Sequence, residues 1–113
     1  MSAEIDRNTF ESLREMTDGD FVNQLVDTFL EDAPVQIRHM KTFVQTGDAE
    51  AFRRAAHSVK SNAATFGAVR LSDLARELET LGKENALEAA SGKIDALEEA
   101  FKSAARELRE LTE

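Results

Sequence analysis

The chain has 113 residues, a length that fits one domain with a buried core. Its 14 basic and 22 acidic side chains give a net charge of −8, which argues against nucleic acid or an anionic membrane as the partner of its whole surface. Cysteine is absent, which excludes disulfides and thiolate chemistry and fits a reducing compartment. The chain has no signal-peptide pattern and no apolar run of the roughly 18 residues that a membrane span needs, so we expect a cytoplasmic protein.

The composition favours helices over strands. Alanine, leucine and charged residues are abundant, whereas the chain has one proline and no tyrosine or tryptophan. A short first helix is expected over about 6–16, and the turn TDGD at 17–20 offers aspartates that can cap the next helix. From Phe21 to about residue 45, apolar residues recur every three or four positions and predict a long helix. Pro34 lies inside this run and lacks a backbone donor, so we expect a kink or a break near 31–34.

Turn-forming residues also separate the helices of the second half. The tripeptide TGD at 46–48 divides the second helix from a third over about 49–66, which Gly67 ends or kinks. A fourth helix is expected over about 68–81, and Gly82 is expected to close it.

Asn85 can cap the last helix, in which apolar residues alternate strictly at three and four positions. These residues are Leu87, Ala90, Ile94, Leu97, Phe101, Ala104, Leu108 and Leu111. Short connections between long amphipathic helices favour antiparallel neighbours. We therefore predict an all-α fold, an antiparallel up-down-up-down four-helix bundle with a short additional N-terminal helix, in which residues 1–113 form a single domain.

Residues 51–72, AFRRAAHSVKSNAATFGAVRLS, contain no acidic side chain, although the average density of the chain would place about four there. The cationic or titratable residues of this segment are Arg53, Arg54, His57, Lys60 and Arg70. These cations could pair with an anionic group attached to the histidine.

Helical geometry separates His57 from the core. The apolar residues of the segment fall on one face of a helix with an advance of about 100° per residue, and His57 lies well away from that face. We therefore expect an exposed histidine with Arg53 and Lys60 one turn before and after it. The small side chains of Ser61 and Ala64 lie beside it and leave the ring accessible to another protein.

Two chemical consequences follow for His57. Nearby cations disfavour the imidazolium, so we expect a neutral ring with a nucleophilic nitrogen. Metal binding is weakly supported, because no second histidine, cysteine or carboxylate lies one turn away. A Ser-His pair for hydrolysis is also weakly supported, since no carboxylate of this segment orients the ring. An ordinary solvated histidine is the remaining alternative, and we interpret His39 in that way.

The segment AHSVKSNAATFGAVRLSDLARELE, residues 56–79, closely resembles the histidine-containing phosphotransfer (HPt) domains of bacterial phosphorelays. The residues that carry the resemblance are Ala56, His57, Val59, Lys60, Ala63, Phe66, Gly67, Ala68 and Leu71. The similarity extends over essentially the whole chain. Ser61 departs from the pattern, since many members of the family have glycine directly after the lysine.

The resemblance implies that His57 attacks, through Nε2, an aspartyl phosphate of a response-regulator receiver domain and returns the group to the aspartate of a second receiver. One of these receivers could belong to a hybrid histidine kinase. Lys60 would steady the phosphoryl oxygens. The other binding residues expected around the site are Arg53, Ser61, Ala64 and Gly67, of which Ala64 and Gly67 would keep the surface clear.

The resemblance also implies a phosphocarrier rather than an enzyme. We expect no cofactor on this chain, because the Mg²⁺ used in transfer would belong to the receiver and no Gly-rich nucleotide loop is present. We expect a monomer that binds neither nucleic acid nor a membrane.

Two other readings stay open. The first is the phosphorylatable histidine domain of a chemotaxis-type kinase, which takes its phosphate from a separate ATP-binding domain and often has an acidic partner for its histidine. SNAA at 61–64 and the acid-free segment favour the relay type instead. The second is a purely structural bundle in which His57 is incidental. The sequence does not decide which of four apolar residues is exposed at a receiver interface: Phe10, Leu13, Phe21 or Val22.

Overall fold

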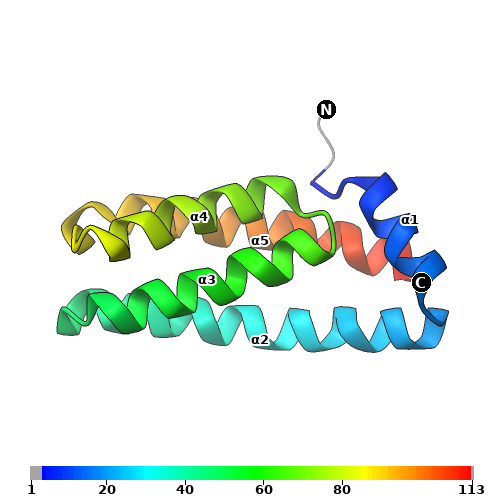
Figure 1. Ribbon diagram of the computed structural model, residues 1–113, viewed down its shortest axis with the longest axis horizontal. Coiled ribbons are helices and arrows are strands. Elements are labelled where there is room, and N and C mark those ends of the chain that lie inside the picture. The colour runs from blue at the N-terminus through cyan, green and yellow to red at the C-terminus, as the bar shows by residue number, and fades with distance from the viewer. Residues whose placement is uncertain (1–3, 113) are drawn as a thin grey trace.

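The computed structural model describes residues 4–112, and within this range it consists of helices joined by short turns. The elements are α1 (Arg7–Met16), α2 (Gly19–Thr46), α3 (Ala49–Thr65), α4 (Val69–Lys83), the 3-10 helix η1 (Leu87–Ala89) and α5 (Ser91–Thr112). Figure 1 shows that α2, α3, α4 and α5 run in alternating directions and that α1 lies at one end of them. Each of the four long helices packs on its two neighbours, α2 on α5 included, so the bundle is closed. The predicted four-helix bundle with an additional N-terminal helix is confirmed.

Aspartate side chains begin three of the helices. Asp6, Asp18 and Asp48 accept hydrogen bonds from backbone N–H groups in the first turns of α1, α2 and α3, at 3.0–3.1 Å. Each bond satisfies a donor that has no partner within the helix. Gly47 ends α2 with φ of 75°, a conformation that glycine adopts without strain. The predicted caps at 17–20 and 46–48 are therefore confirmed.

Of the kink or break expected near Pro34, the break is wrong, because α2 continues from Gly19 to Thr46. Proline removes one backbone donor from the helix. Phe29, Ala33 and Ile37 on either side of it are all buried in the core. Their burial holds both halves of the helix against the bundle, which outweighs one missing hydrogen bond.

The sequence predicts that Gly82 closes α4. This prediction is wrong, because Gly82 lies buried inside the helix. A Cβ atom at this position would lie 2.9 Å from Cβ of Arg53 and 3.0 Å from its Cα. Contacts this short do not occur between real side chains, so the glycine allows α4 to approach the backbone of α3. This close approach occurs one turn after Glu79, a residue of the site described below.

The last helix begins later than predicted. Asn85 has φ of 54° and forms part of a turn, and α5 begins at Ser91 after the short helix η1. Leu87 and Ala90 are nevertheless buried ahead of α5, so the apolar spacing continues through the 3-10 turn. Periodicity therefore located the buried residues correctly and the helix boundary incorrectly.

The N-terminal segment closes one end of the bundle. Ile5 is paired with Ala68 by an isolated bridge, and the N–H of Asp6 donates to the carbonyl of Gly67 at 2.7 Å. Ile5 and Phe10 are almost completely buried there. Gly67 has φ of 77°, and a Cβ on it would lie 2.8 Å from the carbonyl oxygen of Asp6. This position therefore accepts only glycine without strain, both for its conformation and for its contact with the segment before α1.

No helix of residues 4–112 combines the length and the apolar character that crossing a membrane requires.

Candidate functional site

His57 lies on the outer side of α3, as the helical geometry predicts. The residues predicted to form the core face of this helix are buried: Phe52, Ala55, Ala56, Val59, Ala63 and Phe66. The side chain of His57 is 54% exposed. Its ring is therefore held at the surface of a rigid, well-packed helix, where another protein can reach it.

The ring of His57 is hydrogen-bonded to Glu79 of α4, with 2.9 Å between Nδ1 and Oε2. Within residues 4–112, Glu79 is the one charged residue that is buried, with 5% of its surface exposed. The sequence analysis considered carboxylates of residues 51–72 alone, whereas the partner of His57 comes from the next helix, 22 residues along the chain. The stretch 51–72 has no acidic residue in sequence, but in space Glu79 lies beside His57.

Two cations of α3 surround the same carboxylate. Nζ of Lys60 lies 2.6 Å from Oε1 of Glu79, and Nη1 of Arg53 lies 4.0 Å from Oε2. Burial by itself would raise the pKa of the Glu79 carboxyl, but hydrogen bonds from Lys60 and His57 outweigh it and hold the pKa below its ordinary value. Glu79 is therefore an anion at neutral pH, and its negative charge is matched by the cations of α3.

This arrangement decides which nitrogen of His57 is nucleophilic. An ionised carboxylate only accepts hydrogen bonds, so the ring nitrogen that faces Glu79 carries the hydrogen. In a neutral ring the free lone pair is then on Nε2, and about half of the side chain is exposed. The arrangement could therefore serve an oriented nucleophile, because a lysine ammonium and the ring share one buried anion that can stabilise positive charge on the ring.

The remaining predicted residues have different surroundings. Arg53 is half-buried and also pairs with Glu50 through two of its nitrogens. Ser61 and Ala64 are exposed on α3. Gly67 is buried beneath the N-terminal segment, so the expectation that it keeps a docking surface clear is corrected: its missing side chain makes room for Asp6.

Glu79 is the residue that sequence reasoning missed. A weak signal was present, because this residue lies about 80° from Leu71 around α4, at the edge of the apolar face. A carboxylate at the edge of one helix beside a strongly cationic neighbouring helix is a candidate for an interhelical ion pair. The register of the two helices was needed to assign the pair to His57.

Burial reduces the number of apolar residues that could form the interface with a partner. Phe10 and Val22 are buried, Leu13 is half-buried, and Phe21 is 49% exposed. A groove of about 370 Å³ also lies between α2 and α3, where it is lined by Leu25, Thr28, Phe29, Asp32, Asn62, Thr65 and Phe66. Among the described residues, no group of three or more His, Cys, Asp or Glu side chains is placed to hold a metal ion.

Comparison with known proteins gives a consistent result. The family model of the Hpt domain matches residues 24–110, a range that includes α3 with His57 and α4 with Glu79. The crystal structure of histidine-containing phosphotransfer protein B (HptB) from Pseudomonas aeruginosa PAO1 is similar over 99% of this chain and 96% of that chain, with a TM-score of 0.92 and 29% sequence identity. No curated protein sequence matches the chain.

Proposed function

The chain belongs to the Hpt domain family and is a histidine phosphotransfer protein of a phosphorelay, and from this premise we propose that His57 carries its phosphoryl group. The observation that supports this assignment is the hydrogen bond between Nδ1 of His57 and the buried Glu79, which leaves Nε2 free at the surface. His39 lacks such a setting: it is exposed on α2, and its ring contacts that of Phe43.

We propose the following transfer step. The lone pair of Nε2 attacks the phosphorus of an aspartyl phosphate on a receiver domain. A P–N bond forms, the P–O bond to the aspartate breaks, and the aspartate leaves with the electron pair as a carboxylate. The product is an N-phosphoimidazolium whose proton stays on Nδ1, hydrogen-bonded to Glu79. Transfer to a second receiver is the reverse of this step.

Lys60 and Glu79 have complementary roles in this proposal. In the unphosphorylated protein Lys60 donates to Glu79 at 2.6 Å. A phosphoryl group on Nε2 brings new anionic oxygens near the ammonium, which can then turn from the carboxylate to the phosphoryl group. Glu79 loses part of its cationic environment and faces a positively charged ring instead. Charge around Glu79 therefore stays balanced in both states.

The receiver would dock on the exposed side of α3 around His57. Ser61 and Ala64 are small and exposed there, and the groove between α2 and α3 offers an apolar floor that includes Phe29 and Phe66. Interfaces of this kind combine apolar contacts with a polar rim. The Mg²⁺ that assists transfer would be held by the receiver, and we expect this chain to bind no cofactor of its own.

The chemotaxis-type alternative is not favoured, since the similarity to HptB points to the relay type. The acidic partner of His57 does not separate the two, because Glu79 supplies one here. A function as carrier without enzymatic turnover, a monomeric state and a cytoplasmic location stay predictions, as does a receiver that is part of a hybrid kinase.

Phosphotransfer from purified, radiolabelled receiver domains tests this proposal. The chain should acquire a label that is labile in acid and stable in base, and His57→Gln should abolish it, whereas the control His39→Gln should be labelled normally. Helical circular dichroism establishes that both variants fold. Label on the His57→Gln variant would refute the assignment, and label obtained only from a kinase with ATP would restore the chemotaxis-type reading.

A further inference from the structure

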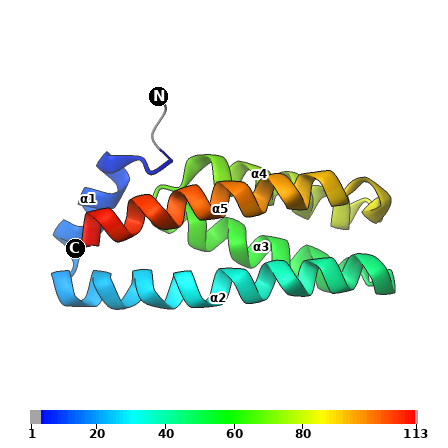
Figure 2. The same cartoon turned by 180° about the vertical axis from the view of Figure 1, so that it is seen from behind.

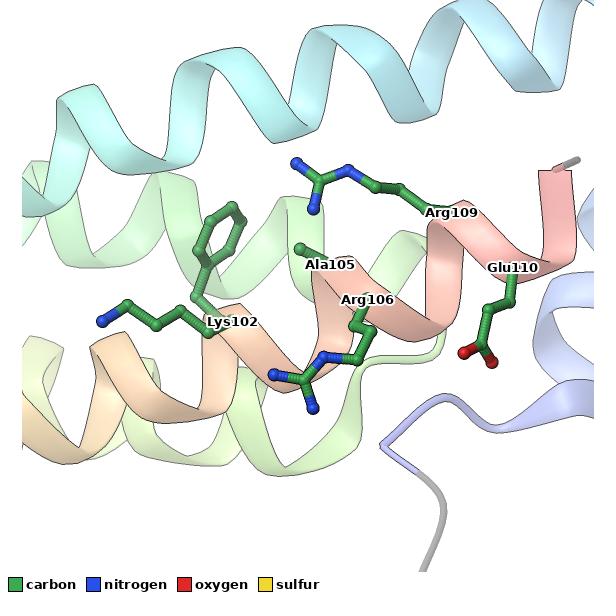
Figure 3. A pocket seen from close by; sticks show the side chains of 6 residues that line it. Lys102, Ala105, Arg106, Arg109 and Glu110 are labelled. Atoms are coloured by element: carbon green, nitrogen blue, oxygen red, sulfur yellow. The ribbon is translucent and has the colours of Figure 1, made fainter.

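A second charged surface lies on α5. A hollow of about 660 Å³ runs along the C-terminal half of this helix, lined by Phe101, Lys102, Ala105, Arg106, Arg109 and Glu110. We call it the α5 basic groove. Figure 3 shows the side chains of Lys102, Arg106 and Arg109 extending from α5 around Ala105. The transfer chemistry of His57 uses none of these residues.

The cations of the α5 basic groove have no ion-pair partner in the part of the chain that the structure describes. Lys102, Arg106 and Arg109 form no ion pair with any side chain of residues 4–112, whereas most other Lys and Arg side chains do. Glu107 of the same helical segment does not neutralise them. Its carboxylate accepts hydrogen bonds from the backbone N–H groups of Glu4 and Ile5 at 2.9 and 3.3 Å.

This positive charge stands out against the rest of the molecule. The chain has a net charge of −8, so a cluster of three cations with only Glu110 among them is a local exception. Such a surface attracts negatively charged partners and repels the acidic faces of other copies of this chain. The three cations are exposed, so they can reach side chains of a partner without prior rearrangement.

The spacing of the cations suits a helix. Lys102 and Arg109 are about 10 Å apart along α5, and Arg106 lies between them. Acidic side chains at positions i, i+4 and i+7 of a second helix have the same separation. Half-buried Phe101 also lines the hollow and offers apolar contact to such a helix. A small anion would not use this apolar area.

The α5 basic groove is also remote from His57. In the closed bundle α3 and α5 are diagonal to each other, since both pack on α2 and α4. The two views agree, with α3 in front in Figure 1 and α5 in front in Figure 2. A partner on α5 therefore leaves the exposed side of α3 free.

We propose that the α5 basic groove binds an acidic amphipathic helix of a partner protein while His57 remains accessible to a receiver domain. Such a contact tethers the partner and raises the local concentration of whatever domain is linked to that helix. The binding does not depend on phosphorylation of His57, so it can be tested separately from the proposed function.

The test uses the full ¹⁵N-labelled chain and a synthetic helical peptide with Glu at i, i+4 and i+7 around a leucine face. We expect amide shifts over residues 101–110 and little change around His57. The variant Lys102→Glu/Arg109→Glu should bind the peptide about tenfold more weakly or worse, because two attractions become repulsions. The control Arg38→Glu/Lys83→Glu has the same net charge as the groove variant. It changes two exposed cations that are unpaired within residues 4–112, so it should bind the peptide nearly as well as the original chain does.

Several results would overturn the proposal. They are an absence of binding, equal weakening in both charge-reversed variants, equal binding of a peptide with Gln in place of Glu, and shifts centred on His57. The same shifts with inorganic phosphate alone would make the groove a small-anion site. Helix content and phosphotransfer from a receiver are measured on each variant, and normal values in both show that the fold and the His57 site are intact.

Discussion

Glu79→Gln tests the proposed chemistry most directly. The substitution keeps the size of the side chain and one oxygen that can accept from Nδ1 of His57, and it removes the negative charge. Glu79 is buried and touches Lys60 as well as His57, so the change acts on the centre of the site. We expect the protein to fold and the ring to keep its orientation.

The size of the effect follows from the geometry. A hydrogen bond to a charged group is worth about 1.5–3 kcal/mol and a neutral one about 1 kcal/mol. The imidazole becomes cationic when Nε2 is phosphorylated, and half of its surface is exposed, so solvent screens part of the attraction. Loss of the charge of Glu79 should therefore destabilise the phosphoimidazolium by about 1–2 kcal/mol, or roughly 5- to 30-fold in the rate of its formation.

A second effect runs in the opposite direction. A protonated imidazole is a better leaving group than a neutral one, and Glu79 keeps the proton on Nδ1. Without the carboxylate charge, the phosphorylated ring loses this proton more readily, and the P–N bond should break more slowly. We therefore expect Glu79→Gln to slow phosphoryl acceptance and to prolong the life of the phosphohistidine.

The assay follows both steps on one sample. Rapid-quench measurement with a labelled receiver gives the acceptance rate, and loss of label from the isolated phosphoprotein gives its lifetime. Glu77→Gln, the same change at an exposed carboxylate of α4 that pairs with Lys93, is the matched control. An acceptance rate within a factor of about two of the original chain would refute a role for the charge of Glu79. A shorter phosphohistidine lifetime would refute the leaving-group argument.

The remaining predictions concern the lysine and the packing that positions the site. Lys60→Met keeps the apolar stem and removes the ammonium, so acceptance should slow by about tenfold in the same assay, and an unchanged rate would show that the lysine does not reach the phosphoryl group. Gly82→Ala places a methyl group 2.9 Å from Cβ of Arg53 and should push α4 from α3, which we expect to show as a changed ¹⁵N signal of the His57 ring and slower acceptance; an unaltered ring signal would contradict it. Gly67→Ala forces a side chain onto a residue with φ of 77° and should lower the free energy of unfolding by about 1–3 kcal/mol in urea titrations, with full stability as the contrary result. The pKa of Glu79 is lowered in the folded protein, so its contribution to stability is complete above the ordinary carboxyl value of 4.5 and is lost as the pH falls below it. As the pH is lowered from about 5 to 3, the urea midpoint of Glu79→Gln should therefore fall less steeply than that of the original chain. Identical slopes for the two proteins would exclude this contribution.

The sequence by itself determined the helices and the exposure of His57. Both depend on a period of 3.6 residues, which is a local property of the chain. The same periodicity identified the buried face of α3, and aspartate and glycine identified most of the helix ends. Local signals were less reliable where packing overrides them, as at Pro34 inside α2 and at Asn85 ahead of α5.

The tertiary structure decided the partner of His57. Glu79 lies 22 residues further along the chain, and nothing in the spacing of either helix specifies how α3 and α4 are aligned. Alignment depends on which surfaces can approach closely, and at Gly82 the absence of a side chain allows α4 to contact the backbone of α3. That contact brings a carboxylate into the cationic surroundings of His57 and so determines which ring nitrogen is free. The sequence could not predict it, because the distance between two helices depends on their packing and not on the periodicity of either one.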